Sequence, residues 1–348
     1  MNNTFPIRLK QARLLAKLSL RELSERANLI VSYNAIKKYE DGKMMPEEPV
    51  ISALAKALAV SPDYFFKPSK IELTNVEFRK RAKLTAKEIS SIKERVKDHV
   101  ERYLEVESIL HISQEFVNPL ANKPISSIDE IENTILQLLK EWNLGYNPIP
   151  NVIEMLEEKG IKIVEIQAPL EFDGLAAMVN SIPVIVLNKA YTPERKRLTA
   201  LHELGHIMLK LPHHWESKEI ERCCHRFASA MLVSKPVMQT LLGKPRTNIT
   251  LDELISIKEQ YGISIQAIVR RAKDLEIIND YAYKNFFIWI SKNRKEEGLG
   301  SYKGEEKSYR FNLLLYRIAA EELVSLAKAA ALGEMKIADL RTVLDKML

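Results

Sequence analysis

The chain has 348 residues, of which 46% are hydrophobic and 28% are charged. This balance is ordinary for a globular protein that is long enough to form two or three domains. No apolar run reaches the roughly 18 residues that span a bilayer, and the N-terminus lacks the apolar core of a signal peptide. The two cysteines, Cys223 and Cys224, are adjacent and do not suit a stapling disulfide. We therefore expect a cytoplasmic protein that has no membrane partner.

The net charge of +6 is unevenly distributed along the chain. Residues 1–38 contain eight Lys or Arg side chains but only two acidic ones, Glu22 and Glu25. A basic run of this kind is either a solvated face or a surface that binds phosphates. The choice between them depends on the helices that carry the charges.

Residues 7–66 read as about five short helices separated by turn residues. Ser19 can begin the second helix as a capping box with Glu22, and Ser32 can begin the third. The third helix then has an apolar side and a polar side. Its outward side presents an aromatic ring, an amide and two cations, which suit base edges and phosphates in a major groove. The predicted DNA-binding residues are Ser32, Tyr33, Asn34, Lys37 and Lys38.

This segment resembles the XRE-type helix-turn-helix domain related to lambda repressor. The stretch LRELSERA is similar to the second helix of that family, and VSYNAIKKYEDGK is similar to its recognition helix and the following turn. The resemblance implies a five-helix, lambda-repressor-like domain over residues 1–70. Its partner would be double-stranded DNA at the protein's own promoter. A helical protein-docking module is the alternative interpretation.

Residues 71–120 are predicted to form a helical linker. Thr85 opens a long helix as a capping box with Glu88. Apolar side chains then recur at alternating spacings of three and four, which is a narrow seam of about three heptads. The seam either pairs two subunits in a homodimer or packs on the downstream domain, and we slightly favour the second. The seam residues are Ile89, Ile92, Val96, His99, Tyr103, Val106 and Leu110.

Helical periodicity dominates the rest of the chain, with β-rich runs only at residues 161–166, 174–180 and 182–188. The predicted fold class is therefore α+β, mostly α, with one small sheet. We expect the sheet to belong to a domain that spans residues 121–280. A helical C-terminal segment, residues 281–348, is expected to follow it.

The stretch TALHELGHIMLKL, residues 199–211, places two histidines and a glutamate in an apolar helix. His202 and His206 are four residues apart and share one helix face, so both imidazoles can bind one zinc ion. Glu203 lies beside that face, where it can act as the catalytic base on a water at the ion. We expect Gly205 to keep this side of the helix thin for the approach of metal and substrate.

The third zinc ligand must come from another part of the chain. Pro212 stands where a metzincin would have its third histidine, so that geometry is excluded. A second helix is predicted over residues 217–233, capped by Ser217, and Glu221 lies on its apolar side. A carboxylate buried there needs a partner, which a metal supplies. Glu221 is the expected third ligand, while the rival His225 is expected to support the ligands without binding the ion.

These residues resemble the ImmA/IrrE family of gluzincin-like metallo-endopeptidases. The stretch from FDGLAAMVN to HELGHIML and the following EIERCCHRFASAMLV are similar to the strands, the HExxH helix and the E-x-x-A-x-x-F-A-x-x-L-L motif of that family. In this match Glu221 falls on the third zinc ligand of the family. The resemblance implies a zincin-like domain with zinc as its cofactor.

The two resemblances together imply a DNA-binding transcriptional regulator with a zinc-dependent endopeptidase domain, whose substrate is a helix-turn-helix repressor. The alternative is an autorepressing antitoxin of a toxin–antitoxin pair, whose zinc domain binds the cognate toxin with little or no proteolysis. If the domain is a peptidase, we expect its substrate to bind in extended form along an exposed edge of the sheet, at the strand over residues 182–188.

Overall fold

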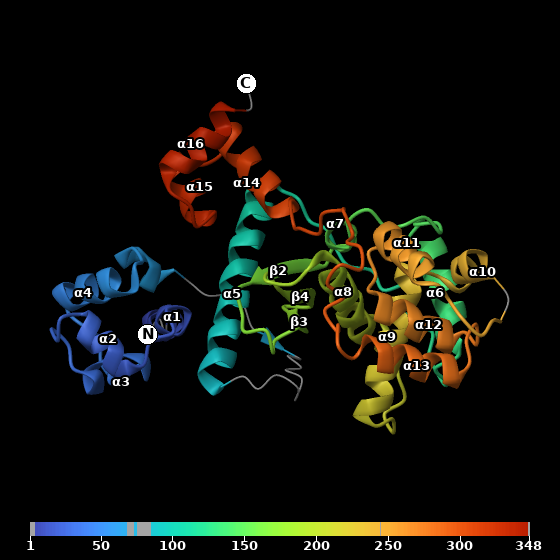
Figure 1. Ribbon diagram of the computed structural model, residues 1–348. Helices are drawn as coiled ribbons and strands as arrows, with labels where there is room; N and C mark the ends of the chain where they lie inside the picture. The colour runs from blue at the N-terminus through green and yellow to red at the C-terminus, as the bar shows by residue number, and fades with distance from the viewer. Residues whose placement is uncertain (1–3, 68–72, 75–84, 244, 347–348) are drawn as a thin grey trace.

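The computed structural model describes residues 4–67, 73–74, 85–243 and 245–346. Figure 1 shows a long central helix, α5 (Ala86–Ile109), with the N-terminal helices on one side and a small sheet on the other. The C-terminal helices lie at one end of α5, and the remaining helices lie beyond the sheet. The fold is α+β and mostly helical, as the sequence predicted. No helix in these described ranges is long and apolar enough to cross a membrane.

The N-terminal domain consists of short helices around its own apolar core. Both expected caps are present. Ser19 and Glu22 form a reciprocal capping box, and the Ser32 hydroxyl accepts a hydrogen bond from the backbone N–H of Ala35. These caps begin the second and third helices where the sequence predicted them. The elements of the domain are α1 (Thr4–Leu15), α2 (Leu20–Arg26), α3 (Tyr33–Glu40), α4 (Glu48–Leu58) and the 3₁₀-helix η1 (Pro62–Phe66).

The N-terminal domain is attached to α5 through a buried arginine. Arg8 of α1 is 3% exposed and makes two parallel hydrogen bonds to the Glu101 carboxylate of α5, at 2.6 and 2.7 Å. Its Nε donates to the carbonyl of Lys67 at 2.8 Å. A bidentate guanidinium–carboxylate pair constrains orientation as well as distance. This contact therefore fixes how α1 lies on α5.

The sheet has four strands in the order β1-β3-β4-β2. β3 pairs with β4 in antiparallel orientation, and β2 pairs with β4 in parallel orientation. The three longer strands were predicted from the sequence, but β1 was not, because two residues carry no periodic signal. The strands are β1 (Leu73–Thr74), β2 (Lys162–Ile166), β3 (Gly174–Val179) and β4 (Ile182–Asn188).

The expectation that the strand over residues 182–188 forms an exposed edge is wrong. This strand, β4, lies between β3 and β2, and its residues are almost all buried. A strand covered on both faces and both edges is apolar throughout, which is the pattern that the sequence displays. On the other side of β3, β1 pairs with Met178 and Val179. Within the described ranges, residues 174–177 of β3 have no strand partner on that side.

The heptad seam of α5 packs within the chain. Ile92 and Val96 contact one face of the sheet in a shared apolar cluster. Further along α5, Tyr103 and Val106 pack against the C-terminal helix α14 (Arg310–Ala320). The seam is therefore satisfied by the downstream part of the same chain, which is the alternative that the sequence slightly favoured.

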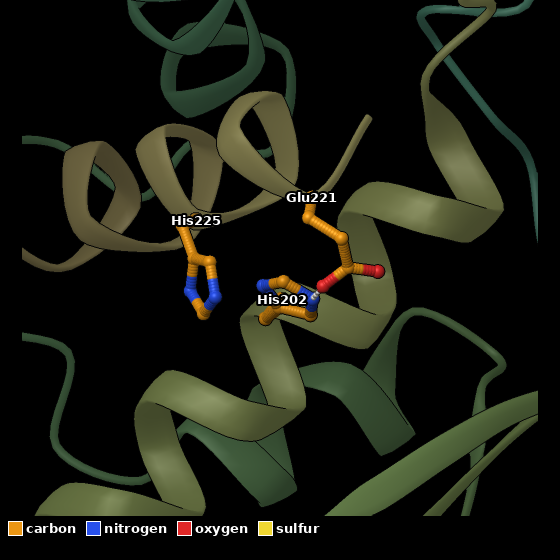
Figure 2. A group of neighbouring side chains, drawn as sticks. All are labelled: His202, Glu221 and His225. Atoms are coloured by element: carbon orange, nitrogen blue, oxygen red, sulfur yellow. Dashed lines mark ion pairs between the residues drawn. The ribbon is translucent and has the colours of Figure 1, made fainter. Parts of the chain in front are cut away.

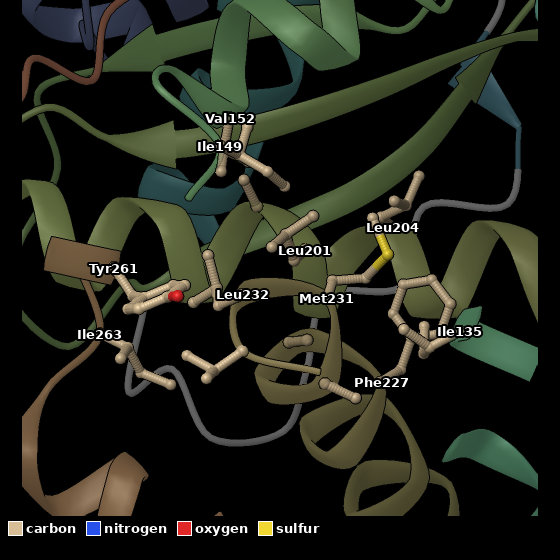
Figure 3. Packing of buried hydrophobic residues seen from close by; sticks show 14 of the residues in the cluster. Ile135, Ile149, Val152, Leu201, Leu204, Phe227, Met231, Leu232, Tyr261 and Ile263 are labelled. Atoms are coloured by element: carbon tan, nitrogen blue, oxygen red, sulfur yellow. The ribbon is translucent and has the colours of Figure 1, made fainter. Parts of the chain in front are cut away.

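The opposite face of the sheet is covered by α8 (Pro193–Met208), and α9 (Ser217–Leu232) packs on α8. Figure 3 shows this core, in which Leu201 and Leu204 of α8 lie close to Met231 of α9. The other helices around this core are α6 (Glu130–Glu141), α7 (Val152–Glu158), α10 (Lys235–Leu242), α11 (Leu251–Tyr261), α12 (Ile265–Asp274) and α13 (Asp280–Ile290). α9 begins one residue earlier than expected, since its N-cap is Glu216 and Ser217 is already helical.

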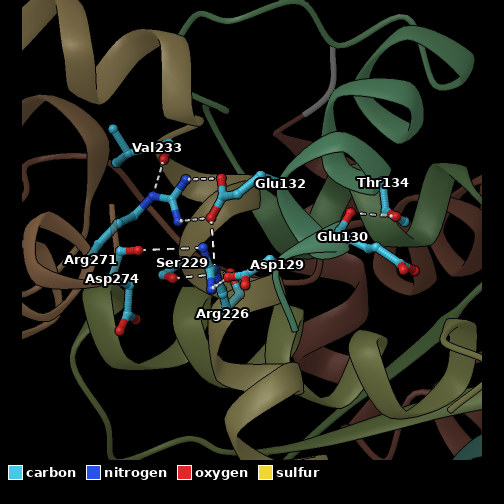
Figure 4. Close-up of polar contacts among 9 residues, drawn as sticks. All are labelled: Asp129, Glu130, Glu132, Thr134, Arg226, Ser229, Val233, Arg271 and Asp274. Atoms are coloured by element: carbon cyan, nitrogen blue, oxygen red, sulfur yellow. Dashed lines mark hydrogen bonds and ion pairs between the residues drawn. The ribbon is translucent and has the colours of Figure 1, made fainter. Parts of the chain in front are cut away.

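A buried ionic network ties α9 to its neighbours (Figure 4). Arg271 of α12 is fully buried and donates to both oxygens of Glu132 of α6, at 3.0 and 2.8 Å. Arg226 of α9 donates to the same carboxylate at 3.1 Å. Burial alone would raise the pKa of Glu132, but the two guanidinium groups hold the pKa below its usual value. The network fixes α6, α9 and α12 relative to one another.

The segment between α13 and α14, residues 293–308, is hereafter called the strap. Two of its carboxylates, Glu296 and Glu306, are buried against the sheet domain. Glu306 pairs with the fully buried Arg197 of α8 at 2.8 Å and accepts the backbone N–H of Ile153 at 2.7 Å. Glu296 pairs with Lys258 at 3.0 Å. After the strap come the last helices, which are α14, α15 (Leu326–Leu332) and α16 (Ile337–Asp345).

The Arg197–Glu306 pair should be essential for the stability of this domain. Replacing Arg197 with Met leaves the Glu306 carboxylate buried without its cation, which costs about 3–5 kcal/mol. We expect a loss of that size in the free energy of unfolding, measured by urea denaturation. The control is Arg195→Gln, which removes an exposed pair with Asp173 and should cost less than about 1 kcal/mol. Equal losses in the two variants would contradict this role of the strap.

Candidate metal centre

The site is built where α8 and α9 approach each other most closely. Gly205 of α8 faces Cys224 of α9, and a Cβ atom on Gly205 would lie 3.3 Å from the Cα, Cβ and Sγ atoms of that cysteine. That spacing is tighter than an ordinary van der Waals contact. Gly205 therefore lets the two helices approach each other. The expectation that it leaves room for metal and substrate is replaced by this role.

The close approach brings three expected ligands together. His202 and His206 come from successive turns of α8, and their Nε2 atoms are 3.3 Å apart. Glu221 of α9 places one carboxylate oxygen 3.5 Å from Nε2 of His202 and the other 3.6 Å from Nε2 of His206. His202 is 2% exposed, while His206 and Glu221 are partly exposed. The ring nitrogens and the carboxylate thus point at one small volume that is open on one side.

These distances can be compared with the needs of a metal ion. Four ligands placed tetrahedrally at about 2.0–2.2 Å from a zinc ion are about 3.4 Å from one another. The observed separations of 3.3, 3.5 and 3.6 Å are close to that value. Two imidazoles and a carboxylate are also ligands that zinc accepts. The residues present therefore fit a metal ion of this kind.

A second, overlapping group includes His225 (Figure 2). His202, Glu221 and His225 each offer a ligand atom, and these atoms lie within 4.8 Å of one another. Figure 2 shows His225 one turn along α9 from Glu221, with both side chains directed towards His202. The rings of His225 and His202 are 4.1 Å apart between centroids. A His/Glu/His group that can bind a metal is therefore present, and His225 lies at its border.

Glu203 and the cysteines complete the surroundings of this group. Glu203 follows His202 on α8 and is 3% exposed. Cys223 and Cys224 are buried and form no disulfide. Burial raises the pKa of the Cys223 thiol to about 12, so this thiol stays protonated at neutral pH. A protonated thiol is a poor metal ligand, so Cys223 is not a candidate ligand at neutral pH.

The predicted DNA-binding residues lie together on a separate surface. Ile36 and Tyr39, on the inner side of α3, are buried in the core of the N-terminal domain. The five predicted contact residues are exposed on the other side. Lys37 forms an ion pair with Asp41 at 2.8 Å, and the Arg21 guanidinium lies over the ring of Tyr33 at 5.3 Å. This face is polar, basic and free of core contacts.

Comparison with known protein families agrees with both parts of the chain. The family described as "Helix-turn-helix" matches residues 9–65, and the family described as "IrrE N-terminal-like domain" matches residues 156–273. No curated protein matches the chain. The two matched regions contain α3 and the α8–α9 pair respectively.

The fold and the site define a DNA-binding helix-turn-helix domain joined to a metallopeptidase-like domain. The chain is a fusion of an XRE-type helix-turn-helix domain with a domain of the IrrE/ImmA family.

The sequence analysis missed one element beside the metal group. A cavity of about 300 Å³ adjoins His225 and is lined by Arg222 of α9 and Arg270 of α12. No sequence motif contains both arginines, because they are far apart in the chain. The packing of α9 against α12 places both of them on the wall of one cavity.

Proposed function

We propose that this protein is a transcriptional regulator that binds DNA through α3 and cleaves a protein partner at a zinc site on α8 and α9. The observation that carries the proposal is the approach of two imidazole nitrogens and one carboxylate to within 3.3–3.6 Å, beside a buried glutamate. The proposed ligands are His202, His206 and Glu221. Zinc is the proposed metal because these ligand types and spacings suit its tetrahedral geometry.

The proposed reaction is hydrolysis of a peptide bond. When bound, zinc polarises the scissile carbonyl and lowers the pKa of water at the site. Glu203 accepts a proton from the attacking water and delivers it to the leaving amine. Because Glu203 is buried, its carboxylate is poorly hydrated, which favours proton transfer over competition with bulk solvent. His225 borders the site from α9 and supports the ligands without being one of them.

The substrate is proposed to bind in extended form on β3. On its outer side β3 pairs with β1 at Met178 and Val179, and residues 174–177 are the part of this edge that we propose pairs with an added peptide. β3 is also next to α8, since a Cβ atom on Gly174 would meet the Thr199 methyl at 2.7 Å. A helix-turn-helix repressor is the proposed substrate, as the family resemblance implies.

The metal assignment predicts about one zinc per chain in the purified protein. His206→Ala and Glu221→Ala should each lose most of this zinc, because each removes one of three ligands. His225→Ala should retain it, because His225 lies outside the proposed set. Elemental analysis of the three variants measures the result. Retained zinc in His206→Ala with loss in His225→Ala would move the site to the second group.

The catalytic assignment predicts that Glu203→Gln keeps the fold and the zinc but loses cleavage by about 10²–10⁴-fold. Glutamine is nearly the same size as glutamate, yet it cannot accept the proton of the water. Cleavage is measured on the protein that co-purifies with the chain. Glu141→Gln, an exposed change at the end of α6, serves as the matched control. Cleavage that survives in Glu203→Gln would contradict the mechanism.

The same variant separates the peptidase from the antitoxin alternative. An antitoxin neutralises its toxin by binding, which needs no base, so Glu203→Gln should rescue growth as well as the wild type does. Scoring fragment formation and growth rescue in parallel therefore assigns the function to one class. Rescue that depends on Glu203 would exclude an antitoxin that acts by binding alone.

For DNA, we expect Lys38→Ala to weaken binding of the full chain to its own promoter and to lower the log–log salt slope by about one. Lys37→Ala should have a smaller effect on the slope, because Asp41 already neutralises part of its charge. Asn34→Ala should change which sequence is preferred, because amides read base edges. Salt-dependent fluorescence anisotropy measures each effect.

The control for charge loss is Lys140→Ala, an exposed change on α6 in the other domain. It should leave promoter binding unchanged. A full chain that binds no promoter fragment at low salt would favour the protein-docking alternative for the N-terminal domain.

A further inference from the structure

The cavity beside the metal group is formed by four helices. Its lining comes from α8, α9, α12 with its N-cap Ser264, and α13, together with Ile128, two residues before α6. Leu198 of α8 lies one turn before His202, and His225 forms the wall shared with the metal group. At about 300 Å³ the cavity lies at the small end of the range of ligand pockets, and it is large enough to receive a side chain of a bound protein. It therefore lies where a side chain next to a bond at the metal would project.

Two arginines give the cavity its charge. Arg222 follows Glu221 on α9, and Arg270 is on α12. Both are exposed, and neither forms an ion pair or side-chain hydrogen bond with another described residue. A third arginine in the lining, Arg226, is already neutralised by Glu132 and Asp129 at 3.1 and 2.8 Å. The two uncompensated guanidinium groups are therefore the ones available to a ligand.

One acidic group also lines the cavity. Asp274 lies one turn along α12 from Arg270 and is partly exposed. It offsets one of the two positive charges, so the cavity keeps a net positive charge without being strongly basic. Guanidinium groups bind carboxylates through two parallel hydrogen bonds, which is more specific than a point charge.

We propose that this cavity is a specificity site for an acidic side chain, Asp or Glu, next to the scissile bond of the protein substrate. Arg222 and Arg270 bind its carboxylate, and Asp274 limits the strength of that binding. The inference rests on the proposed peptidase function for its position along the substrate. The cavity and its two arginines are independent of catalysis, so binding can be tested without it.

The test uses the full-length, zinc-loaded Glu203→Gln chain and a positional-scanning library of fluorescein-labelled decapeptides with amidated C-termini. Binding is measured by anisotropy at low and high salt. We expect peptides with Glu or Asp at one fixed position to bind about tenfold more tightly than those with Gln. Arg222→Gln and Arg270→Gln should each reduce this preference, and Asp274→Asn should increase it. Lys218→Gln, an exposed change one turn before Arg222, should leave the preference unchanged.

Equal affinity for Glu and Gln peptides, or a preference that survives both arginine changes, would overturn the proposal. Peptides with a free C-terminal carboxylate distinguish recognition of the chain end from recognition of a side chain, and tighter binding only of free C-termini also overturns it. The wild-type chain is then incubated with the same library. A binding preference without any cleavage would reject the peptidase function while leaving the acidic-side-chain site in place.

Discussion

The close contact between α8 and α9 is the constraint on which the rest of the metal-binding domain depends. Two histidines on one helix can bind a single ion, but here the third ligand comes from another helix. That helix must lie close enough to place its side chain beside both imidazoles. Gly205 permits that approach, since a Cβ atom there would crowd Cys224 at 3.3 Å. As a result the Glu221 carboxylate lies 3.5–3.6 Å from both imidazoles.

Such an arrangement requires a rigid surrounding, and buried ion pairs supply part of it. Arg271 and Glu132 join α12 to α6, and Arg226 connects the same carboxylate to α9. On the other side, Arg197 fixes α8 to the strap through Glu306. Replacing a whole buried ion pair by apolar side chains often costs little stability, but separating the partners leaves a buried charge without compensation, so each pair favours the arrangement in which its partners meet. Their position next to the helices of the metal group is consistent with a role in orienting those helices.

The two halves of the chain share α5. One side of this helix binds the N-terminal domain through Arg8 and Glu101, and its apolar seam covers the sheet. A dimer through the same seam would require α5 to leave the sheet and expose Ile92 and Val96, which are buried here. The outward face of α3 is polar and is not used in these contacts. The helix-turn-helix domain and the IrrE/ImmA-like domain are therefore connected through α5.

The sequence by itself determined the local elements and the type of chemistry. Capping residues such as Ser19 and Ser32, the β-rich runs of three strands and the spacing of His202 and His206 are all short-range patterns, and short-range geometry decides them. The sequence did not determine the order of the strands, the residue that faces Gly205, or that Arg222 and Arg270 line the same cavity. These depend on which surfaces pack against each other, and residues distant in the chain decide that through their combined shape. The strap shows the same limit, because only the tertiary structure brings Glu306 against Arg197. A buried carboxylate is stable when a cation lies beside it, and here that cation comes from a residue distant in the sequence.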